Sequence, residues 1–156
     1  MMISIKWIIT DDLSSVSVEE FENEWNGIIE GYFELIVNEQ RVGFCPNREI
    51  KKGEDGLEDI MFWLIEFNRG LKEVKKGEIY EMRLLTRNLY KLILKKGEKV
   101  ELQYAKEDTN QIDWKEEVEM QEFEQEIFQN IEKFKNEIQR INPNLLNSKW
   151  IQKLEY

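Results

Sequence analysis

The chain has 156 residues, with 32 Asp and Glu against 22 Lys and Arg, which gives a formal net charge of −10 at pH 7. Phosphate backbones and anionic lipids repel such a charge, so we expect no binding to nucleic acid or to a membrane surface. The length and the 41% hydrophobic content suit one packed core, and we expect a single globular domain over residues 1–156.

The sequence also indicates a cellular compartment. It has no apolar run approaching the roughly 20 residues of a membrane-spanning helix, and its first residues lack the pattern of a signal peptide. The single cysteine, Cys45, has no partner for an internal disulfide, which is typical of a reducing environment. We therefore expect a cytoplasmic protein.

The first half of the chain alternates between strand and helix patterns. Apolar residues at every second position predict a strand over residues 3–9. Ser17 and Glu20 have the spacing of a capping box, which predicts the start of a short helix. On that helix one side would carry Val18, Phe21, Trp25, Ile28 and Ile29. Alternation over 33–37 and 42–44 then predicts a β-hairpin.

The second half contains two long helical patterns around a meander. Residues 57–74 carry apolar side chains around so much of the helix circumference that we expect a buried helix. Alternation over residues 79–105 predicts a three-stranded antiparallel meander, with one more strand over 112–118. Three- and four-residue spacing predicts a helix over 121–141, and residues 145–154 predict a final helical turn or two.

These elements predict an α+β fold. Alternating strands have one apolar and one polar face, and both long helices need an apolar surface to cover. We therefore expect a mainly antiparallel sheet of six or seven strands, with the helices over 57–74 and 121–141 packed on one face of it.

Residues 11–40 carry nine carboxylates and no Lys or Arg. Charge of one sign over thirty residues creates a field that attracts cations, so a basic protein is the natural partner for this segment. The alternative is a solvated face that keeps the protein soluble. The predicted partner-binding residues belong to this segment: Asp11, Asp12, Glu19, Glu20, Glu22, Glu24, Trp25 and Glu30.

The residue types of common active sites are largely missing. The chain contains no histidine, which rules out Ser–His and Cys–His nucleophile pairs and removes the usual ligand of transition metals. We find no catalytic motif, expect no cofactor and no metal, and interpret the chain as a binding protein rather than an enzyme.

Weaker candidate sites favour a structural interpretation. Asp11-Asp12, Asp55 and Asp59 are the best candidates for a hard cation such as Ca²⁺, but none fits the EF-hand pattern. The glycine-containing loop 53–56 carries two carboxylates that would repel phosphate. Cys45 would need a nearby cation for activation, and we interpret it as a structural thiol.

Tryptophans are frequent interface anchors, and three of them are candidates for that role. Trp114 fits the apolar face of its predicted strand, and Trp150 is interpreted as a core residue. Trp25 differs because it lies inside the acidic segment.

Two stretches carry a resemblance to known proteins. The run WNGIIEGYFELIVNEQRVGFCP (25–46) and the ending FEQEIFQNIEKFKNEIQRINPNLLNSKWIQKL (123–154) resemble small acidic proteins of low-GC Gram-positive bacteria. Some of those resemble immunity proteins encoded beside secreted polymorphic toxins. The resemblance implies a cytosolic protein that binds and blocks a toxin domain, and it assigns no functional residue.

Two functional interpretations follow. The first is an acidic protein-interaction module, an immunity protein that blocks a basic toxin domain. The second is a carboxylate-dependent enzyme or small-ligand-binding domain, which would show a deep pocket with two carboxylates pointing into it. An uncharacterised housekeeping domain without a strong partner remains a third interpretation.

Overall fold

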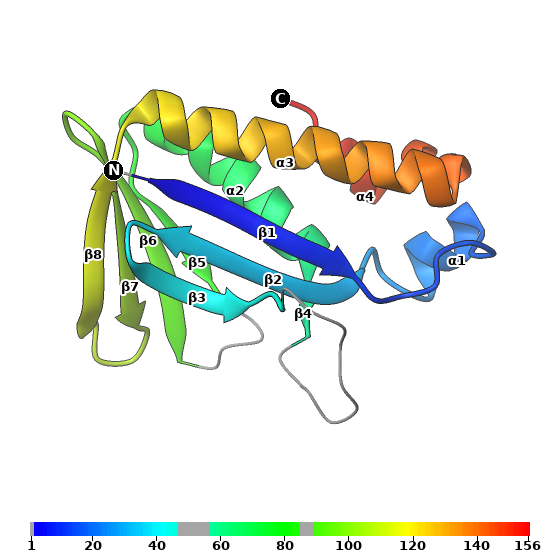
Figure 1. Cartoon of the computed structure of the whole chain (residues 1–156), viewed down its shortest axis with the longest axis horizontal. Coiled ribbons are helices and arrows are strands. Elements are labelled where there is room, and N and C mark those ends of the chain that lie inside the picture. Colours follow the sequence, from blue (N-terminus) through cyan, green and yellow to red (C-terminus); the bar gives the residue numbers. More distant parts are fainter. Residues whose placement is uncertain (1, 47–56, 85–88) are drawn as a thin grey trace.

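The computed structural model describes residues 2–46, 57–84 and 89–156, and it shows an α+β fold with two antiparallel sheets (Figure 1). The first sheet contains β1 (Ile3–Ile9), β2 (Glu30–Val37), β3 (Gln40–Phe44) and β4 (Glu58–Asp59). Strand β2 is central, because β1 pairs with one of its edges and β3 and β4 pair with the other. The predicted first strand and hairpin are confirmed.

The second sheet is a meander with the order β5-β6-β7-β8. Its strands are β5 (Tyr80–Arg83), β6 (Tyr90–Lys96), β7 (Val100–Lys106) and β8 (Ile112–Val118). The predicted meander and the additional strand are confirmed. The prediction of one sheet of six or seven strands is wrong, because the eight strands of the described chain form two sheets of four.

Helix α2 (Ile60–Lys75) packs against both sheets. It contacts β2 of the first sheet and β5 and β6 of the second. The prediction placed both long helices on one sheet face, whereas α2 packs against both sheets. Its broad apolar surface is therefore buried on more than one side, as the sequence indicated.

Helix α3 (Met120–Ile141) is the second long helix, and it lies along β1 and α2 (Figure 1). An aromatic chain runs through the core from sheet to helix. Phe33 of β2 stacks on Trp63 at a centroid distance of 4.6 Å, Trp63 stacks on Phe67 at 5.8 Å, and Phe67 meets Phe123 of α3 at 6.3 Å. One cluster of buried side chains includes residues of both sheets and of both long helices.

Short helical elements lie at one end of the molecule. They are α1 (Val18–Asn23), the 3-10 turn η1 (Pro143–Asn147) and α4 (Lys149–Gln152). The buried Asn142 side chain donates hydrogen bonds to the carbonyl oxygens of Leu13 (2.8 Å) and Val16 (2.7 Å). It thereby attaches the loop before α1 to the end of α3. The final helical turns predicted over 145–154 are confirmed.

None of the helices in the described ranges combines the length and the apolar character that crossing a bilayer requires.

Candidate functional site: two hollows beside helix α1

Two hydrogen bonds hold the residues that follow β1 against the start of β2. The Thr10 N–H donates to the carbonyl oxygen of Glu30 at 3.1 Å, and the Glu30 N–H donates to Oδ2 of Asp11 at 2.7 Å. The Asp11 carboxylate therefore continues the pairing of β1 and β2 beyond the last paired residues. The second hydrogen bond brings Asp11 and Glu30 of the acidic segment together, although they are separated by 19 positions.

Helix α1 is shorter than the pattern of apolar residues predicts. The capping box is confirmed, since Ser17 accepts from the Glu20 N–H and the Glu20 carboxylate accepts from the Ser17 N–H. The helix ends at Asn23, and Asn26 and Gly27 then adopt left-handed φ angles of 53° and 72°. These two residues turn the chain, so Ile28 is 44% exposed instead of sharing the buried side with Phe21.

A first hollow lies at the end of this turn. It has a volume of about 270 Å³ and is lined by Asp11, Trp25, Ile28 and Glu30, and we call it the acidic hollow. Three of its four residues were predicted partner-binding residues. An indole and an exposed isoleucine here adjoin two carboxylates, an arrangement that suits the alkyl stem and the charged head of a Lys or Arg side chain.

A second hollow lies on the other side of Ile28. It has a volume of about 330 Å³ and we call it the mixed hollow. Its lining residues come from the turn after α1, from the end of β4, from α2, and from α4 and the residue after it: Asn26, Gly27, Ile28, Asp59, Met61, Phe62, Ile65, Glu66, Arg69, Trp150 and Lys153. Because Ile28 lines both hollows, the two hollows adjoin each other.

Asp59 fixes the base of the mixed hollow. Its carboxylate caps α2 by accepting from the Met61 N–H at 3.1 Å, and the same oxygen accepts from the Ile29 N–H at 3.2 Å. Burial raises the pKa of the Asp59 carboxyl above its usual value, although the backbone hydrogen bonds oppose this shift. The nearby negative charge of Glu30 raises the pKa further.

Charged side chains of the mixed hollow have partners within the fold. The Tyr80 hydroxyl donates to Glu66 at 2.6 Å, and Arg69 lies 3.6 Å from the same carboxylate oxygen. Burial, followed by the contact with Glu66, raises the pKa of Tyr80, so its hydroxyl stays protonated. The Lys153 ammonium lies 4.1 Å from the Trp150 ring centroid, which is cation–π geometry.

The other predicted residues have different environments. Asp12 accepts from the backbone N–H (3.1 Å) and the hydroxyl (2.6 Å) of Ser14, and these hydrogen bonds lower the pKa of Asp12. Glu22 accepts from the Lys149 N–H of α4 at 3.4 Å. Glu19 and Glu24 are exposed.

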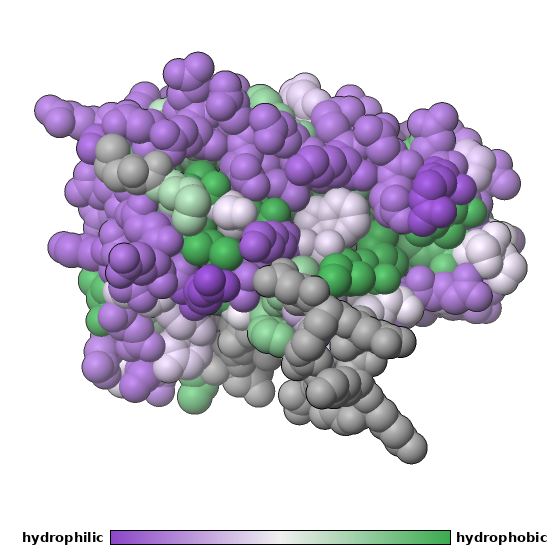
Figure 2. All heavy atoms as spheres, in the orientation of Figure 1, coloured by the Kyte–Doolittle hydropathy of each residue, from purple (hydrophilic) through white to green (hydrophobic). Residues whose placement is uncertain are grey.

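The acidic segment is not one continuous surface. Residues 11–30 lie around α1, but Glu34 is buried on the central strand β2 and pairs with Arg41 at 3.2 Å. Glu39 lies in the β2–β3 turn, whose Asn38 contacts the second sheet. The surface that faces the viewer in Figure 2 has apolar side chains over β1 and β2 and toward α1, with hydrophilic side chains around them.

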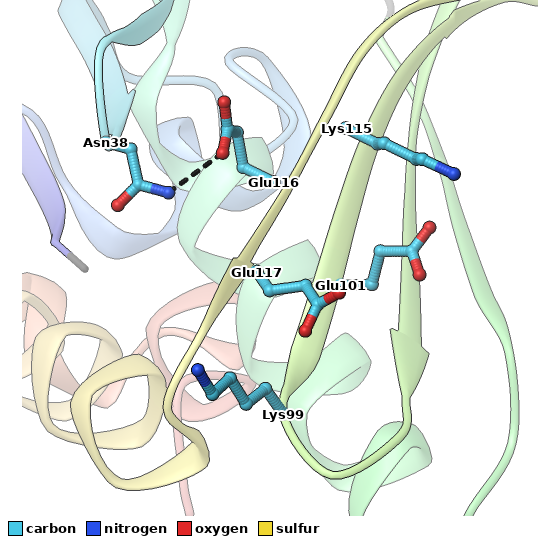
Figure 3. Close-up of a pocket in the computed structure, with 6 residues that line it drawn as sticks. All are labelled: Asn38, Lys99, Glu101, Lys115, Glu116 and Glu117. Atoms are coloured by element: carbon cyan, nitrogen blue, oxygen red, sulfur yellow. Dashed lines mark hydrogen bonds between the residues drawn. The ribbon is translucent and has the colours of Figure 1, made fainter.

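A third hollow, of about 360 Å³, lies between the β2–β3 turn and the second sheet (Figure 3). Asn38 donates to Glu116 of β8 at 3.0 Å across it. Its other lining residues alternate in sign: Lys99, Glu101, Lys115 and Glu117. With Glu116, the lining carries three carboxylates and two cations. Because the Asn38–Glu116 hydrogen bond joins the first sheet to the second across this hollow, we interpret the hollow as a structural contact.

The weaker predicted sites gain no support as ligand sites. No group of three His, Cys, Asp or Glu side chains within the described ranges is arranged to hold a metal ion. Asp55 and the loop 53–56 lie outside the described residues, and so do Arg48, Lys51 and Lys52, three cations that follow Cys45 in the sequence. Burial and the charge of Glu34 raise the pKa of the half-buried Cys45 thiol, which opposes a reactive thiolate.

Of the candidate tryptophans, Trp114 is half-buried beside Tyr104 and contributes to neither hollow. Sequence reasoning missed the contribution of Trp150, Arg69 and Lys153 to the mixed hollow. No local pattern could have shown it, because these residues meet through the packing of α4 near α2.

A scan against protein-family models, a search of curated proteins and a search of solved structures each found no significant match.

Proposed function

We propose that this protein is an acidic protein-interaction module that binds a basic protein through the acidic and mixed hollows. One observation carries the proposal: Asp11, Trp25 and Glu30, separated in the sequence, line a single hollow together with Ile28, which is 44% exposed. Protein interfaces usually have an apolar anchor residue at the centre and polar or charged residues around it.

The chemistry of the partner follows from the lining. Two carboxylates in the acidic hollow select a Lys or Arg side chain, and the apolar residues of the mixed hollow select a neighbouring aliphatic or aromatic side chain. A basic toxin domain that binds nucleic acid has such cationic side chains on its active surface. We infer that the immunity-type role, blocking a toxin encoded beside this gene, suits this surface best.

The alternative of a carboxylate-dependent enzyme or small-ligand domain has less support. Asp11 and Asp59 accept backbone hydrogen bonds, and Glu66 holds Tyr80 and Arg69. Carboxylates in such positions hold neighbouring groups of the fold in place, whereas proton transfer needs a carboxylate with access to a bound substrate.

The test uses two matched charge-reversal variants. Glu24→Lys with Glu30→Lys changes the α1 end, and Glu78→Lys with Glu98→Lys changes exposed residues elsewhere. Both pairs take the net charge from −10 to −6, since each exchange adds two positive charges. Association with the basic domain encoded by the neighbouring gene is measured at low and at high salt.

We expect the first pair to slow association at low salt by about tenfold or more and to flatten its salt dependence, because steering depends on local charge. The second pair should have a much smaller effect. Ile28→Ala should leave the association rate unchanged and speed dissociation. Equal effects of the two charge pairs, or no complex with the wild-type protein, would overturn the proposal.

A further inference from the structure

Strand β8 forms an open edge of the second sheet. It is the last strand in the order β5-β6-β7-β8, and within the described part of the chain it pairs only with β7. Of its seven residues only Val118 is buried. An open edge offers unpaired backbone N–H and C=O groups to another strand. In Figure 1, β8 and α1 lie at opposite ends of the long axis, so this edge is remote from the acidic segment around α1.

The pairing with β7 determines which backbone groups of β8 point outward. Neighbouring residues of a strand turn their N–H and C=O groups to opposite sides. The Lys106 N–H donates to the Gln111 carbonyl oxygen at 2.8 Å, so every second residue of β7, Tyr104 among them, turns toward β8. Trp114 is the register partner of Tyr104 and turns back toward β7. The backbone groups of Lys115 therefore point to the open side.

Two opposite charges flank Trp114 on this edge. Asp113 and Lys115 are both exposed, and neither forms an ion pair with the described residues. Figure 3 shows Lys115 on the other side of β8 from Glu116. Trp114 itself is half-buried, and its ring lies 5.8 Å from that of Tyr104 between centroids. The edge thus carries an aromatic ring between an anion and a cation that have no charged partner.

This pattern is complementary to itself in one antiparallel register. When two copies of a strand pair about a two-fold axis, one residue lies opposite its own copy, and its two neighbours lie opposite each other. With Trp114 at the centre, Asp113 of each copy lies opposite Lys115 of the other. The registers centred on Asp113, Lys115 or Glu116 place two like charges opposite each other instead. Because opposite charges and aromatic pairs favour strand pairing and like charges oppose it, the register centred on Trp114 is selected.

We propose that β8 pairs with β8 of a second copy of this chain, in the antiparallel register centred on Trp114, and so forms a symmetric dimer. The two meanders of four strands then form one sheet of eight. The α1 ends lie at the two far ends of such a dimer, where their negative charges repel each other least and stay accessible. The proposal does not rest on the proposed function, because no residue of β8 lines the acidic or the mixed hollow.

The experiment is analytical ultracentrifugation of the wild-type protein over about a hundredfold range of concentration. We expect the mean mass to rise from that of a monomer toward that of a dimer. Asp113→Lys and Lys115→Asp each place like charges opposite each other twice in the dimer, so each should weaken dimerisation at least tenfold. Lys96→Asp, at an exposed position of β6, makes the same change in charge as Lys115→Asp and should have a much smaller effect. Far-UV circular dichroism checks that each variant is folded.

Two rescue experiments separate pairing between chains from a role within one chain. The double variant Asp113→Lys with Lys115→Asp exchanges the two charges and should dimerise about as well as the wild type. An equimolar mixture of the two single variants should also dimerise, because each chain then supplies the charge that its partner lacks. A loss of stability within one chain would not be repaired by mixing, so absence of rescue in both experiments would overturn the proposal.

The remaining outcomes concern other occupants of the edge. A wild type that stays monomeric at every concentration would overturn the proposal. So would a dimer that the two single variants weaken no more than Lys96→Asp does, because the interface would then lie elsewhere. A monomeric wild type whose complex with the basic domain encoded by the neighbouring gene is weakened by Lys115→Asp would show that this edge binds that domain instead of a second copy.

Discussion

Gly27 holds the turn between the two hollows in a conformation that suits glycine for two reasons. Its φ of +72° is left-handed, and a Cβ at this position would lie 2.3 Å from two atoms of the Trp150 ring. Gly77 has a similar φ of +85°, but a Cβ there would meet no atom within 4 Å. Comparing substitutions at Gly27 and Gly77 therefore separates the effect of backbone conformation from the effect of side-chain contact.

We therefore expect Gly27→Ala to lower the free energy of unfolding more than Gly77→Ala does. Both variants lose about 1–2 kcal/mol from the left-handed conformation. Gly27→Ala should lose about 1–3 kcal/mol more, because the added methyl group displaces the indole. Urea unfolding measures both values, and equal losses would show that Trp150 moves aside without cost.

Asp59 gives a prediction that depends on pH. The pKa of this carboxyl is raised in the folded protein, chiefly by burial, above the 3.8 of an ordinary Asp. Protons therefore bind the folded state more tightly. The stability that this brings is fully present below the unfolded pKa and is lost as pH rises through the folded pKa. At pH 7 the buried charge is a net cost.

Asp59→Asn removes that charge and keeps an oxygen that can accept from the Ile29 and Met61 N–H groups. We expect it to be at least as stable as the wild type at pH 7, with an advantage that shrinks toward pH 3.5. Asp59→Ala, which also loses the helix cap, should cost about 0.5–2 kcal/mol. If Asp59→Asn were as destabilising as Asp59→Ala at pH 7, the charge would be favourable to α2.

Single residues also show which contacts the sequence could reveal. The capping box of Ser17 and Glu20 was predictable because its partners are three positions apart. Asp59 bonds a backbone group 30 positions away, and Glu22 bonds one 127 positions away. No local spacing marks such partners, so residues that appeared to be solvated acids proved to have structural roles.

At the scale of elements, hydrophobic periodicity located all the longer strands and both long helices. It could not divide the strands between sheets, because alternation shows which side chains face the core but not which strand lies next to which. The two-residue strand β4 is too short to show alternation, and it moves the start of α2 from 57 to Ile60.

Helix α2 should contribute strongly to stability, because it packs against both sheets. Leu64 has no exposed surface, so Leu64→Ala should lower the free energy of unfolding by about 2–5 kcal/mol. Leu57, which is 41% exposed and precedes the helix, is the matched control, and Leu57→Ala should change stability by no more than about 0.5 kcal/mol. Urea unfolding of a Leu64→Ala protein as stable as the wild type would show that the core lies elsewhere.

At the scale of the whole molecule, charge is distributed unevenly. Carboxylates of residues 11–30 gather around α1, whereas the hollow between β1 and α3 is lined by charges of both signs, among them Lys133, Glu137 and Arg140. The sequence revealed the first feature because its acids are contiguous. It could not reveal that Lys133 and Arg140 of α3 lie near β1, because that proximity arises only when α3 packs along the strand.

This distribution predicts a salt dependence of folding. Like charges around α1 repel one another in the folded protein, and raising ionic strength from about 0.01 M to about 0.15 M shortens the screening length from roughly 30 Å to roughly 8 Å. We expect the urea midpoint of the wild type to rise over this range. Glu24→Lys with Glu30→Lys should remove more of that rise than Glu78→Lys with Glu98→Lys, although both pairs change the net charge equally. An identical response of the two variants would mean that the repulsion is spread over the whole surface. The negative potential that steers a basic partner would then not be concentrated around α1.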